Sequence, residues 1–294
     1  MNQAQVINVP VYLACGGLVA CLLLVPVKME FYEANLAWAY ILLLSFLSTY
    51  MATPAAMVLA QRLGVMDYPN ERKIHANPTP LWGGLGVYFG FASAVVYNCN
   101  FSVELKGVVL GATVMLVLGL LDDAVGLSAR LKLLVQLLAV TVMVLHGVVI
   151  TLVPSGWPAA RVLNLVITYL WIVGIVNALN FMDGIDGLAA GLAAISSLYI
   201  GVTAVYTGQG YLMYLAWALL GSCLGFLPYN FRRSGPARVF LGDGGSTFLG
   251  FSLAAMAVMG GWGESYPLKA FILPTLILGV LIYDVVYITI SRVL

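Results

Sequence analysis

Long apolar segments divide this chain of 294 residues and leave it few alternatives to a lipid bilayer. A helix needs about 20 mostly apolar residues to cross the hydrocarbon layer. Segments of roughly that length are predicted at 9–27, 37–59, 82–98, 107–121, 132–151, 162–177, 188–206, 211–228, 245–260 and 269–290. We therefore expect an all-α fold: a polytopic helical bundle of about ten transmembrane helices, forming one domain over residues 1–294.

The composition supports a membrane protein. Hydrophobic residues make up 62% of the chain and charged residues 9%, so a water-soluble fold would expose too much apolar surface. The four cysteines are isolated and predict neither a disulfide framework nor a zinc site. The net charge of +1 gives no indication of nucleic-acid binding. The segment 9–27 lacks the basic start of a secretory signal, so we predict a helix there.

The basic residues are unevenly divided between the two sides of the predicted bundle. If the loops 60–81, 122–131, 178–187 and 229–244 and the tail 291–294 share a side, nine of the thirteen Lys and Arg residues lie in or beside them. Positive charge favours the cytoplasmic side of a membrane. This side is therefore predicted to be cytoplasmic, and it also holds five acids: Asp122, Asp123, Asp183, Asp186 and Asp243.

The motif beginning at Asn177 carries the strongest chemical signal. Asn177, Asn180, Asp183 and Asp186 follow one another at intervals of three, so on a helical turn they face one side and can converge on one ligand. Oxygen donors of this kind suit Mg²⁺ or the hydroxyl and amide edges of a nucleotide. Charged side chains at a membrane edge are costly and usually mark a functional site.

Two further acidic sites allow a structural and a functional interpretation. Asp122 and Asp123 follow an apolar run and could cap the next helix, but adjacent carboxylates repel, which favours a metal-binding or general-base role. Asp243 lies in a glycine-rich stretch that opens a predicted helix. It could be a simple helix cap or a metal-ligating carboxylate beside a phosphate, and the sequence pattern favours neither role.

The remaining polar stretches are less specific. The loop 67–80 contains Arg72, Lys73 and His75, which offer donors for a phosphate, although an ordinary cytoplasmic loop would look similar. His146 stands alone and is interpreted as structural. Asp284 lies within the last predicted helix, and we assign it no catalytic step.

Taken together, these motifs resemble a known family. The run from Pro69 to His75, Leu121-Asp-Asp, the motif from Asn177 to Leu188, Tyr229-Asn-Phe and Val239-Phe-Leu-Gly-Asp-Gly-Gly-Ser match, in order, the polyprenyl-phosphate N-acetylhexosamine-1-phosphate transferases. The resemblance implies a multi-pass protein of the bacterial inner membrane with a cytoplasmic active site. Its expected reaction is Mg²⁺-dependent transfer of N-acetylglucosamine 1-phosphate from UDP-N-acetylglucosamine to undecaprenyl phosphate, with release of UMP, at the start of surface polysaccharide synthesis. The alternative within the family is the same transfer with another UDP-N-acetylhexosamine.

The resemblance also implies roles for individual residues. Asp122, Asp123 and Asp243 are the expected catalytic residues, and Asp243 and Asp183 the expected ligands of Mg²⁺ or Mn²⁺. The expected substrate-binding residues are Arg72, Lys73, His75, Asn177, Asn180, Asp183, Asp186 and Asn230. The expected partners are the UDP-sugar, the polyprenyl phosphate and the bilayer, without nucleic acid, and a homodimer is compatible with the pattern.

Two departures from the family pattern and one rival interpretation stand beside this hypothesis. The segment 9–27 precedes the part that resembles the family, and the chain stops at Leu294, where members continue into a histidine-containing loop and another helix. We therefore expect an extra first span and a truncated C-terminus. An ion-coupled transporter would also carry acids within the membrane, but near its midplane and in repeated halves, and we find neither pattern.

Overall fold

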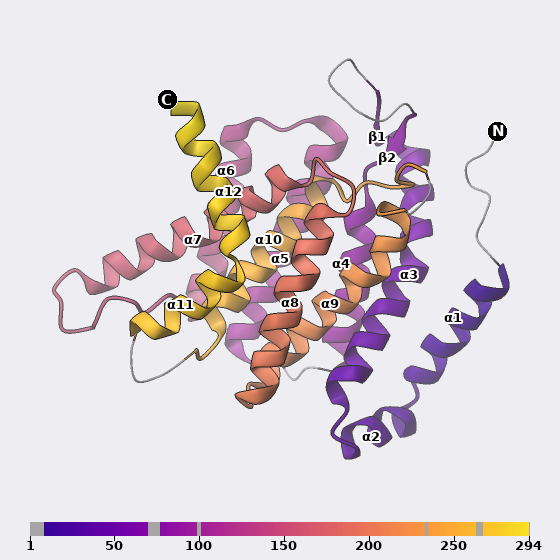
Figure 1. The fold of residues 1–294 in the computed structure, drawn as a ribbon, viewed down its shortest axis with the longest axis horizontal. Helices are drawn as coiled ribbons and strands as arrows, with labels where there is room; N and C mark the ends of the chain where they lie inside the picture. Colours follow the sequence, from indigo (N-terminus) through magenta and orange to yellow (C-terminus); the bar gives the residue numbers. More distant parts are fainter. Residues whose placement is uncertain (1–8, 70–76, 99–100, 233–234, 263–266, 294) are drawn as a thin grey trace.

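The computed structural model describes residues 9–69, 77–98, 101–232, 235–262 and 267–293, and these fold into a helical bundle (Figure 1). Its elements, in order, are α1 (Val9–Leu22), α2 (Val25–Glu33), α3 (Ala37–Leu63), β1 (Met66–Asp67), β2 (Thr79–Pro80), α4 (Gly83–Asn98), α5 (Val103–Val125), α6 (Ala129–Leu145), α7 (Ala160–Met182), α8 (Leu188–Tyr206), α9 (Gly210–Asn230), α10 (Gly242–Met259), α11 (Pro267–Ile277) and α12 (Gly279–Val293). The two short strands pair in antiparallel fashion. The all-α class predicted from the apolar segments is confirmed.

Two of the predicted helices are broken. The segment predicted at 9–27 forms α1 and α2, which meet at an angle of 73°. Pro26 stands in the first turn of α2, where the missing N–H costs nothing, whereas inside a continuous helix it would remove a hydrogen bond and clash with the preceding turn. The segment predicted at 269–290 forms α11 and α12, and the break lies just before Gly279, a poor helix former.

Five helices of the described chain are long and apolar enough to cross a membrane: α3, α5, α7, α8 and α9. The bent pair α1 and α2 adds a sixth if it is counted as one span. These helices make the chain a polytopic membrane protein. The number of ten spans remains a prediction, because the other helices are shorter or less apolar.

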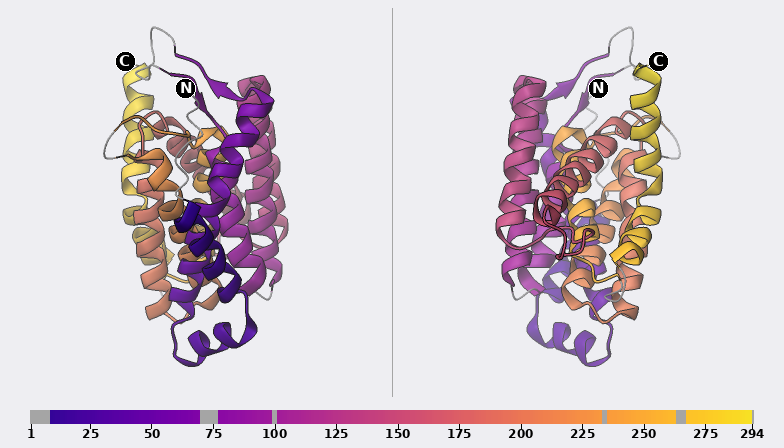
Figure 2. Two further views of the ribbon diagram at one scale, coloured as in Figure 1. Left: turned by 90° about the vertical axis from the view of Figure 1, so that its right-hand side faces the viewer. Right: turned by 90° about the vertical axis from the view of Figure 1, so that its left-hand side faces the viewer.

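Helix α10 forms the centre of the bundle, surrounded by α4, α5, α7 and α8 (Figures 1 and 2). Almost every residue from Gly242 to Ala257 is buried, as expected for a helix that is apolar on all sides. Gly119 lets α5 come close to the first turn of α10, because a Cβ there would lie 2.3 Å from the carbonyl carbon of Asp243. The start of α10 is therefore held in tight contact with the last turns of α5.

Several helix ends meet at one end of this bundle. The N–H of Phe240 donates to the carbonyl of Pro80 over 2.9 Å, and the N–H of Gly83 donates to the carbonyl of Phe240 over the same distance. These bonds join the strand β2 and the start of α4 to the segment that precedes α10. The ends of α5, α7 and α9 and the starts of α6 and α8 lie nearby through the contacts described below.

Candidate active site

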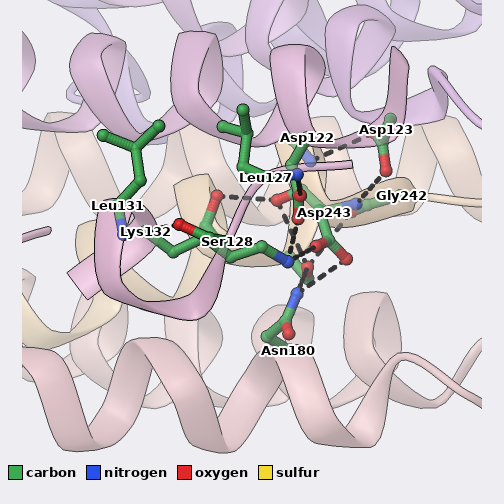
Figure 3. A network of polar contacts seen from close by, with 12 residues as sticks. Asp122, Asp123, Leu127, Ser128, Leu131, Lys132, Asn180, Gly242 and Asp243 are labelled. Carbon is green, nitrogen blue, oxygen red and sulfur yellow. Dashed lines mark hydrogen bonds and ion pairs between the residues drawn. The ribbon is translucent and has the colours of Figure 1, made fainter. Parts of the chain in front are cut away.

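Four polar side chains from four different helices meet at this end of the bundle (Figure 3). Lys132 of α6 forms ion pairs with Asp122 of α5 and with Asp243 of α10, the latter with 3.1 Å between Nζ and Oδ2. Asn180 of α7 donates to the other oxygen of Asp243 over 3.0 Å. Residues more than a hundred positions apart in the sequence therefore share one cluster, and Asp243 lies at its centre.

Lys132 is the member of the cluster that the sequence interpretation missed. It served there only in the count of basic residues that set the orientation. Yet it opens the apolar segment 132–151, and a charged residue at the edge of a span is a functional candidate in its own right. Its side chain is 35% exposed, so it remains accessible from the aqueous end of the bundle while it contacts both carboxylates.

The two adjacent acids of α5 have different partners. Asp122 accepts a hydrogen bond from the N–H of Leu127 over 2.7 Å. This bond holds the turn between α5 and α6 and so keeps Lys132, in the first turn of α6, close to Asp122. Asp123 accepts from the N–H groups of Asp243 and Gly244, at 2.9 and 3.4 Å. Asp123 thus caps α10 from a neighbouring helix, because the residue at the N-cap position of α10 is an apolar leucine.

The first turn of α10 is shaped by Gly242 and by two hydroxyl groups. Gly242 has a φ of 76°, and a Cβ there would lie 2.6 Å from Oδ2 of Asp123, so only glycine fits without displacing that carboxylate. Ser246 receives a hydrogen bond from Asn180 over 2.9 Å, and Thr247 donates to the carbonyl of Asp243. The glycine-rich stretch is therefore both a turn and the support of Asp243.

Asp183 follows α7 directly and adds another carboxyl group. Its pKa is raised well above the ordinary value of 3.8 by burial first, and then by the charges of Asp243 and Asp123. Burial and the neighbouring Asp122 carboxylate also raise the pKa of Asp243. Because Lys132 is the cation that contacts this group of aspartates in the described chain, the site favours binding of further positive charge.

The other predicted residues of the asparagine motif have different partners. Asn177 lies one turn deeper in α7 and pairs with Gln136 of α6. Asp186 accepts from the N–H of Ala237 over 3.3 Å. Asn180 and Asp183 therefore face the start of α10, whereas Asn177 contacts α6 and Asp186 contacts the segment before α10.

Asn230 at the end of α9 belongs to this outer part of the site. Its carbonyl oxygen accepts from the N–H of Gly187 over 2.6 Å, and its amide donates to the carbonyl of Val239 over 3.0 Å. It joins the turn between α7 and α8 to the segment before α10. Arg72, Lys73 and His75 lie outside the described residues, while His146 caps α6 at the opposite end and Asp284 lies half-buried in α12.

Asp183 and Asp243 are the carboxyl groups of the site that could contribute to a metal shell. The described residues contain no group of three or more His, Cys, Asp or Glu side chains arranged to hold a metal ion. Mg²⁺ commonly takes one or two carboxylates and completes its shell with substrate phosphates and water. Asp183 and Asp243, both next to further negative charge, have the chemistry that such a site requires.

An apolar groove of about 370 Å³ lies between α5 and α6, and its lining residue Leu127 contacts this cluster. Leu121 precedes Asp122, Leu127 donates its N–H to Asp122, and Leu131 precedes Lys132. The remaining lining residues are Leu110, Thr113, Val114, Val117, Leu118 and Val135. An elongated apolar molecule in this groove would have its end next to Asp122 and Lys132.

The fold and the site define a polytopic helical membrane protein in which a cluster of carboxyl groups and one lysine lies at one end of the bundle, beside an apolar groove. Residues 105–261 match the model of Glycosyl transferase family 4. The chain belongs to this family, as its motifs predicted.

Known relatives agree with this assignment. The chain is 37% identical over 262 residues to a probable undecaprenyl-phosphate N-acetylglucosaminyl 1-phosphate transferase of Bacillus subtilis, covering 86% of this chain and 71% of that protein. It is 40% identical over 230 residues to a decaprenyl-phosphate N-acetylglucosaminephosphotransferase of Mycolicibacterium smegmatis, covering 70% of this chain and 56% of that protein. A phospho-N-acetylmuramoyl-pentapeptide-transferase of Moorella thermoacetica is 34% identical over 247 residues, or 74% of each chain.

Proposed function

We propose that this protein transfers N-acetylglucosamine 1-phosphate from UDP-N-acetylglucosamine to undecaprenyl phosphate and so begins the synthesis of a surface polysaccharide. An oxygen of the lipid phosphate forms a bond to the phosphorus that carries the sugar. The bond from that phosphorus to the oxygen of the UMP group breaks, and UMP leaves with the electron pair. The observation that carries the proposal is the cluster of Asp122, Lys132, Asn180 and Asp243 beside an apolar groove.

The groove supports a lipid acceptor. A polyprenyl chain is long and apolar, and a groove lined by aliphatic side chains of α5 and α6 would hold it without burying polar groups. Its phosphate would then lie beside Lys132, whose ammonium attracts an anion. Asp122 keeps Lys132 in place and orients the attacking phosphate.

We assign the donor nucleotide to the side of Asp243 that Asn180 contacts, away from Lys132. Asn180, Asp183, Asp186 and Asn230 present amide and carboxylate groups around the turn that follows α7. Such groups can hydrogen-bond ribose hydroxyls and a uracil edge. Arg72, Lys73 and His75 are proposed phosphate contacts on the strength of the family resemblance alone.

Asp243 and Asp183 are the proposed holders of Mg²⁺, with Mn²⁺ as a substitute. The bound ion would neutralise negative charge on the pyrophosphate of the donor. Phosphoryl transfer between two anions depends mainly on positioning and on charge neutralisation, so it needs little covalent participation by the protein. Asp123 contributes by holding the start of α10, and thereby Asp243, in place.

The site is proposed to face the cytoplasm of a bacterial cell, in the inner membrane. The predicted loops at this end carry most of the basic residues, which is typical of cytoplasmic loops. A transporter from another class of membrane protein would also need acids within its spans, but it would move its substrate without altering it.

The direct test is release of UMP by the purified protein in detergent. It is given UDP-N-acetylglucosamine and undecaprenyl phosphate, with Mg²⁺ or with EDTA, and parallel reactions contain decaprenyl phosphate or UDP-N-acetylmuramoyl-pentapeptide. We expect release that needs both substrates, stops with EDTA and is fastest with the first pair. The variant Asp243→Asn should remain folded and lose the release.

Other outcomes would contradict particular parts of the proposal. A faster reaction with the pentapeptide donor would contradict the assigned sugar and leave the phosphotransfer intact. Full activity of Asp243→Asn would contradict its role at the metal. Absence of UMP with all donors, together with uptake of an unaltered sugar nucleotide into proteoliposomes, would favour the transporter.

A further inference from the structure

A pair of amide side chains lies about one helical turn further from the aqueous end than the charged cluster, and the proposed chemistry does not use it. Asn177 of α7 donates to the side-chain carbonyl of Gln136 of α6 over 3.0 Å, and Gln136 donates back to the carbonyl of Asn177 over 3.4 Å. Asn177 also donates to the backbone carbonyl of Val173 over 2.7 Å. Gln136 is 5% exposed and Asn177 is half-buried, so the Gln136 side of this reciprocal pair is shielded from water.

The hydrogen bonds of Asn177 leave it little capacity to bind a ligand. A primary amide has two N–H donors and one carbonyl acceptor. Both donors of Asn177 have partners, in Gln136 and in Val173, and its carbonyl accepts from Gln136. A nucleotide could use only the second lone pair of this carbonyl without displacing one of these bonds, and the loss of a bond at a half-buried amide is costly.

The pair lies in register with the two side chains that hold Asp243. Gln136 follows Lys132 by four residues on α6, and Asn177 precedes Asn180 by three residues on α7. Residues at these spacings share one face of a helix. Lys132 and Asn180 both contact the carboxylate of Asp243, so the amide pair joins the same two helices one turn further from the aqueous end.

Beside the cluster, the amide pair is the polar link between α6 and α7 in the described chain, and a hydrogen bond of 2.7 Å between the hydroxyl groups of Thr141 and Tyr169 joins the two helices further along. The helices otherwise touch little, since α6 packs mainly on α5 and α7 packs mainly on α10. Apolar contacts permit small sliding movements, whereas a reciprocal amide pair requires one particular register of the two helices. A shift of α6 along α7 would move Lys132 relative to Asn180 and change how both hold Asp243. The pair is thus placed to determine this geometry.

We propose that Gln136 and Asn177 are positioning residues that set the register of α6 against α7 and so place Lys132 and Asn180 on Asp243. This inference rests on the proposed phosphotransfer for its kinetic consequences. The motif suggested that Asn177 contacts the substrate, whereas the proposal gives it the role of supporting the site. Neither side chain takes part in the reaction itself.

The test compares Gln136→Leu and Asn177→Leu with a matched control on the same helix. Asn164 is a buried asparagine of α7, whereas Asn177 is half-buried; Asn164 also makes a reciprocal pair, with the backbone of Val153 at 2.8 and 3.1 Å, but it lies at the opposite end of the bundle. Asn164→Leu therefore removes a comparable pair far from the cluster. The swapped double variant Gln136→Asn with Asn177→Gln restores an amide pair between the helices.

The kinetic readout separates positioning from substrate binding. We expect kcat for UMP release to fall roughly 10- to 100-fold in the two single variants, as displacement of catalytic groups by about 1 Å would cause, with KM for the sugar nucleotide within about twofold. The swapped variant should regain a large part of kcat, and Asn164→Leu should keep it. A raised KM with unchanged kcat in Asn177→Leu would overturn the proposal and show that Asn177 binds the nucleotide. An equal loss of kcat in Asn164→Leu would also overturn it, because it would show that the amide pair only stabilises the fold.

A second readout is independent of activity. Amide hydrogen exchange is measured on peptides that cover residues 126–135 and 176–187, the ends of α6 and α7 beside the cluster. Faster exchange there in Gln136→Leu, with unchanged exchange in Asn164→Leu, is expected even if the protein releases no UMP. If wild-type protein is inactive but exchange behaves as expected, the phosphotransfer fails and the register role stands; unchanged exchange in Gln136→Leu would overturn the register role.

Discussion

At the scale of single residues, charge balance dominates the candidate site. Asp122, Asp123, Asp183 and Asp243 come together with Lys132 as the cation that contacts two of them. Ionised carboxylates at such short separations repel one another, and burial strengthens the repulsion. The site therefore gains from any further positive charge, which is the physical reason for the divalent cation that we propose there.

Lys132 should be required for turnover because it pairs with both Asp122 and Asp243 and attracts the lipid phosphate. We expect Lys132→Met to lower kcat for UMP release by roughly 10²–10³-fold, the usual effect of losing one fixed electrostatic contact. The control is Lys106→Met, an exposed lysine in the first turn of α5 at the opposite end. Retention of more than about a tenth of the activity by Lys132→Met would remove the residue from the mechanism.

Asp183 should make the metal-free protein less stable as the pH rises. Folding raises its pKa above 3.8, so the folded state binds this proton more tightly than the unfolded state. The resulting stability is complete below about pH 4 and is lost as the pH rises through the raised pKa. In EDTA, we expect Tm in detergent to fall from pH 5 to pH 8, and the fall to be smaller in Asp183→Asn.

The same variant has a second expected effect at neutral pH. In EDTA, Asp183→Asn should raise Tm by roughly 2–4 °C, because it removes one of the repelling charges. It should also reduce the increase in Tm that Mg²⁺ causes in the wild type. A variant that melts lower than the wild type in EDTA would show that the carboxylate is stabilising without a metal.

At the scale of elements, the site depends on the close approach of α5 to the start of α10. Gly119 permits this approach, and Asp123 completes it by capping the free N–H groups of α10. Helix α5 therefore both allows the close approach of α10, through Gly119, and caps it, through Asp123. The position of Asp243 follows from this contact between the two helices.

Gly119→Ala should disturb the site through the backbone. The added Cβ would lie 2.3 Å from the Asp243 carbonyl group, so α10 would have to move. We expect a loss of about 1–3 kcal/mol in stability, typical of overpacking, together with a marked loss of UMP release. Tm and activity are measured beside Gly191→Ala in α8, where a Cβ meets nothing within 4 Å and both should be retained. Wild-type activity in Gly119→Ala would contradict the tight contact.

At the scale of the whole molecule, the bundle places its chemistry at one end only. The helices α3, α5, α7, α8 and α9 are long enough to cross a bilayer, and α10 lies among them with its first turn at the polar end (Figure 1). The groove between α5 and α6 lies beside the cluster there. A lipid from the bilayer and a nucleotide from water could therefore meet at this cluster.

The orientation of the bundle is tested with single cysteines in a variant that lacks Cys15, Cys21, Cys99 and Cys223. Gly184→Cys lies in the exposed turn after α7, beside the site, and Ser155→Cys lies in the exposed loop before α7 at the other end. In intact cells, we expect a membrane-impermeant maleimide to label position 155 and to spare position 184. Inverted vesicles should give the reverse pattern, and labelling of position 184 in intact cells would place the site outside.

Much of the fold and part of the site could be predicted from local patterns. Apolar runs of about 20 residues identify membrane helices without reference to neighbours, and most predicted segments match observed helices. Pro26 and Gly279 mark breaks that the continuous hydrophobicity concealed, because apolarity continues through both positions. The three-residue spacing predicted that four side chains share a site: Asn180 and Asp183 lie beside the start of α10, whereas Asn177 pairs with Gln136 and Asp186 with Ala237.

The sequence by itself determined that this chain belongs in a membrane, that its helices run between polar ends, and to which family it belongs. These properties depend on composition, on the length of apolar runs and on short motifs, all of which are local. Only the tertiary structure decided that Lys132 contacts Asp243, 111 positions away, and that Gln136 pairs with Asn177. Such contacts depend on which helices pack together and in what register, and that is a property of the whole bundle, since each helix face can meet several partners.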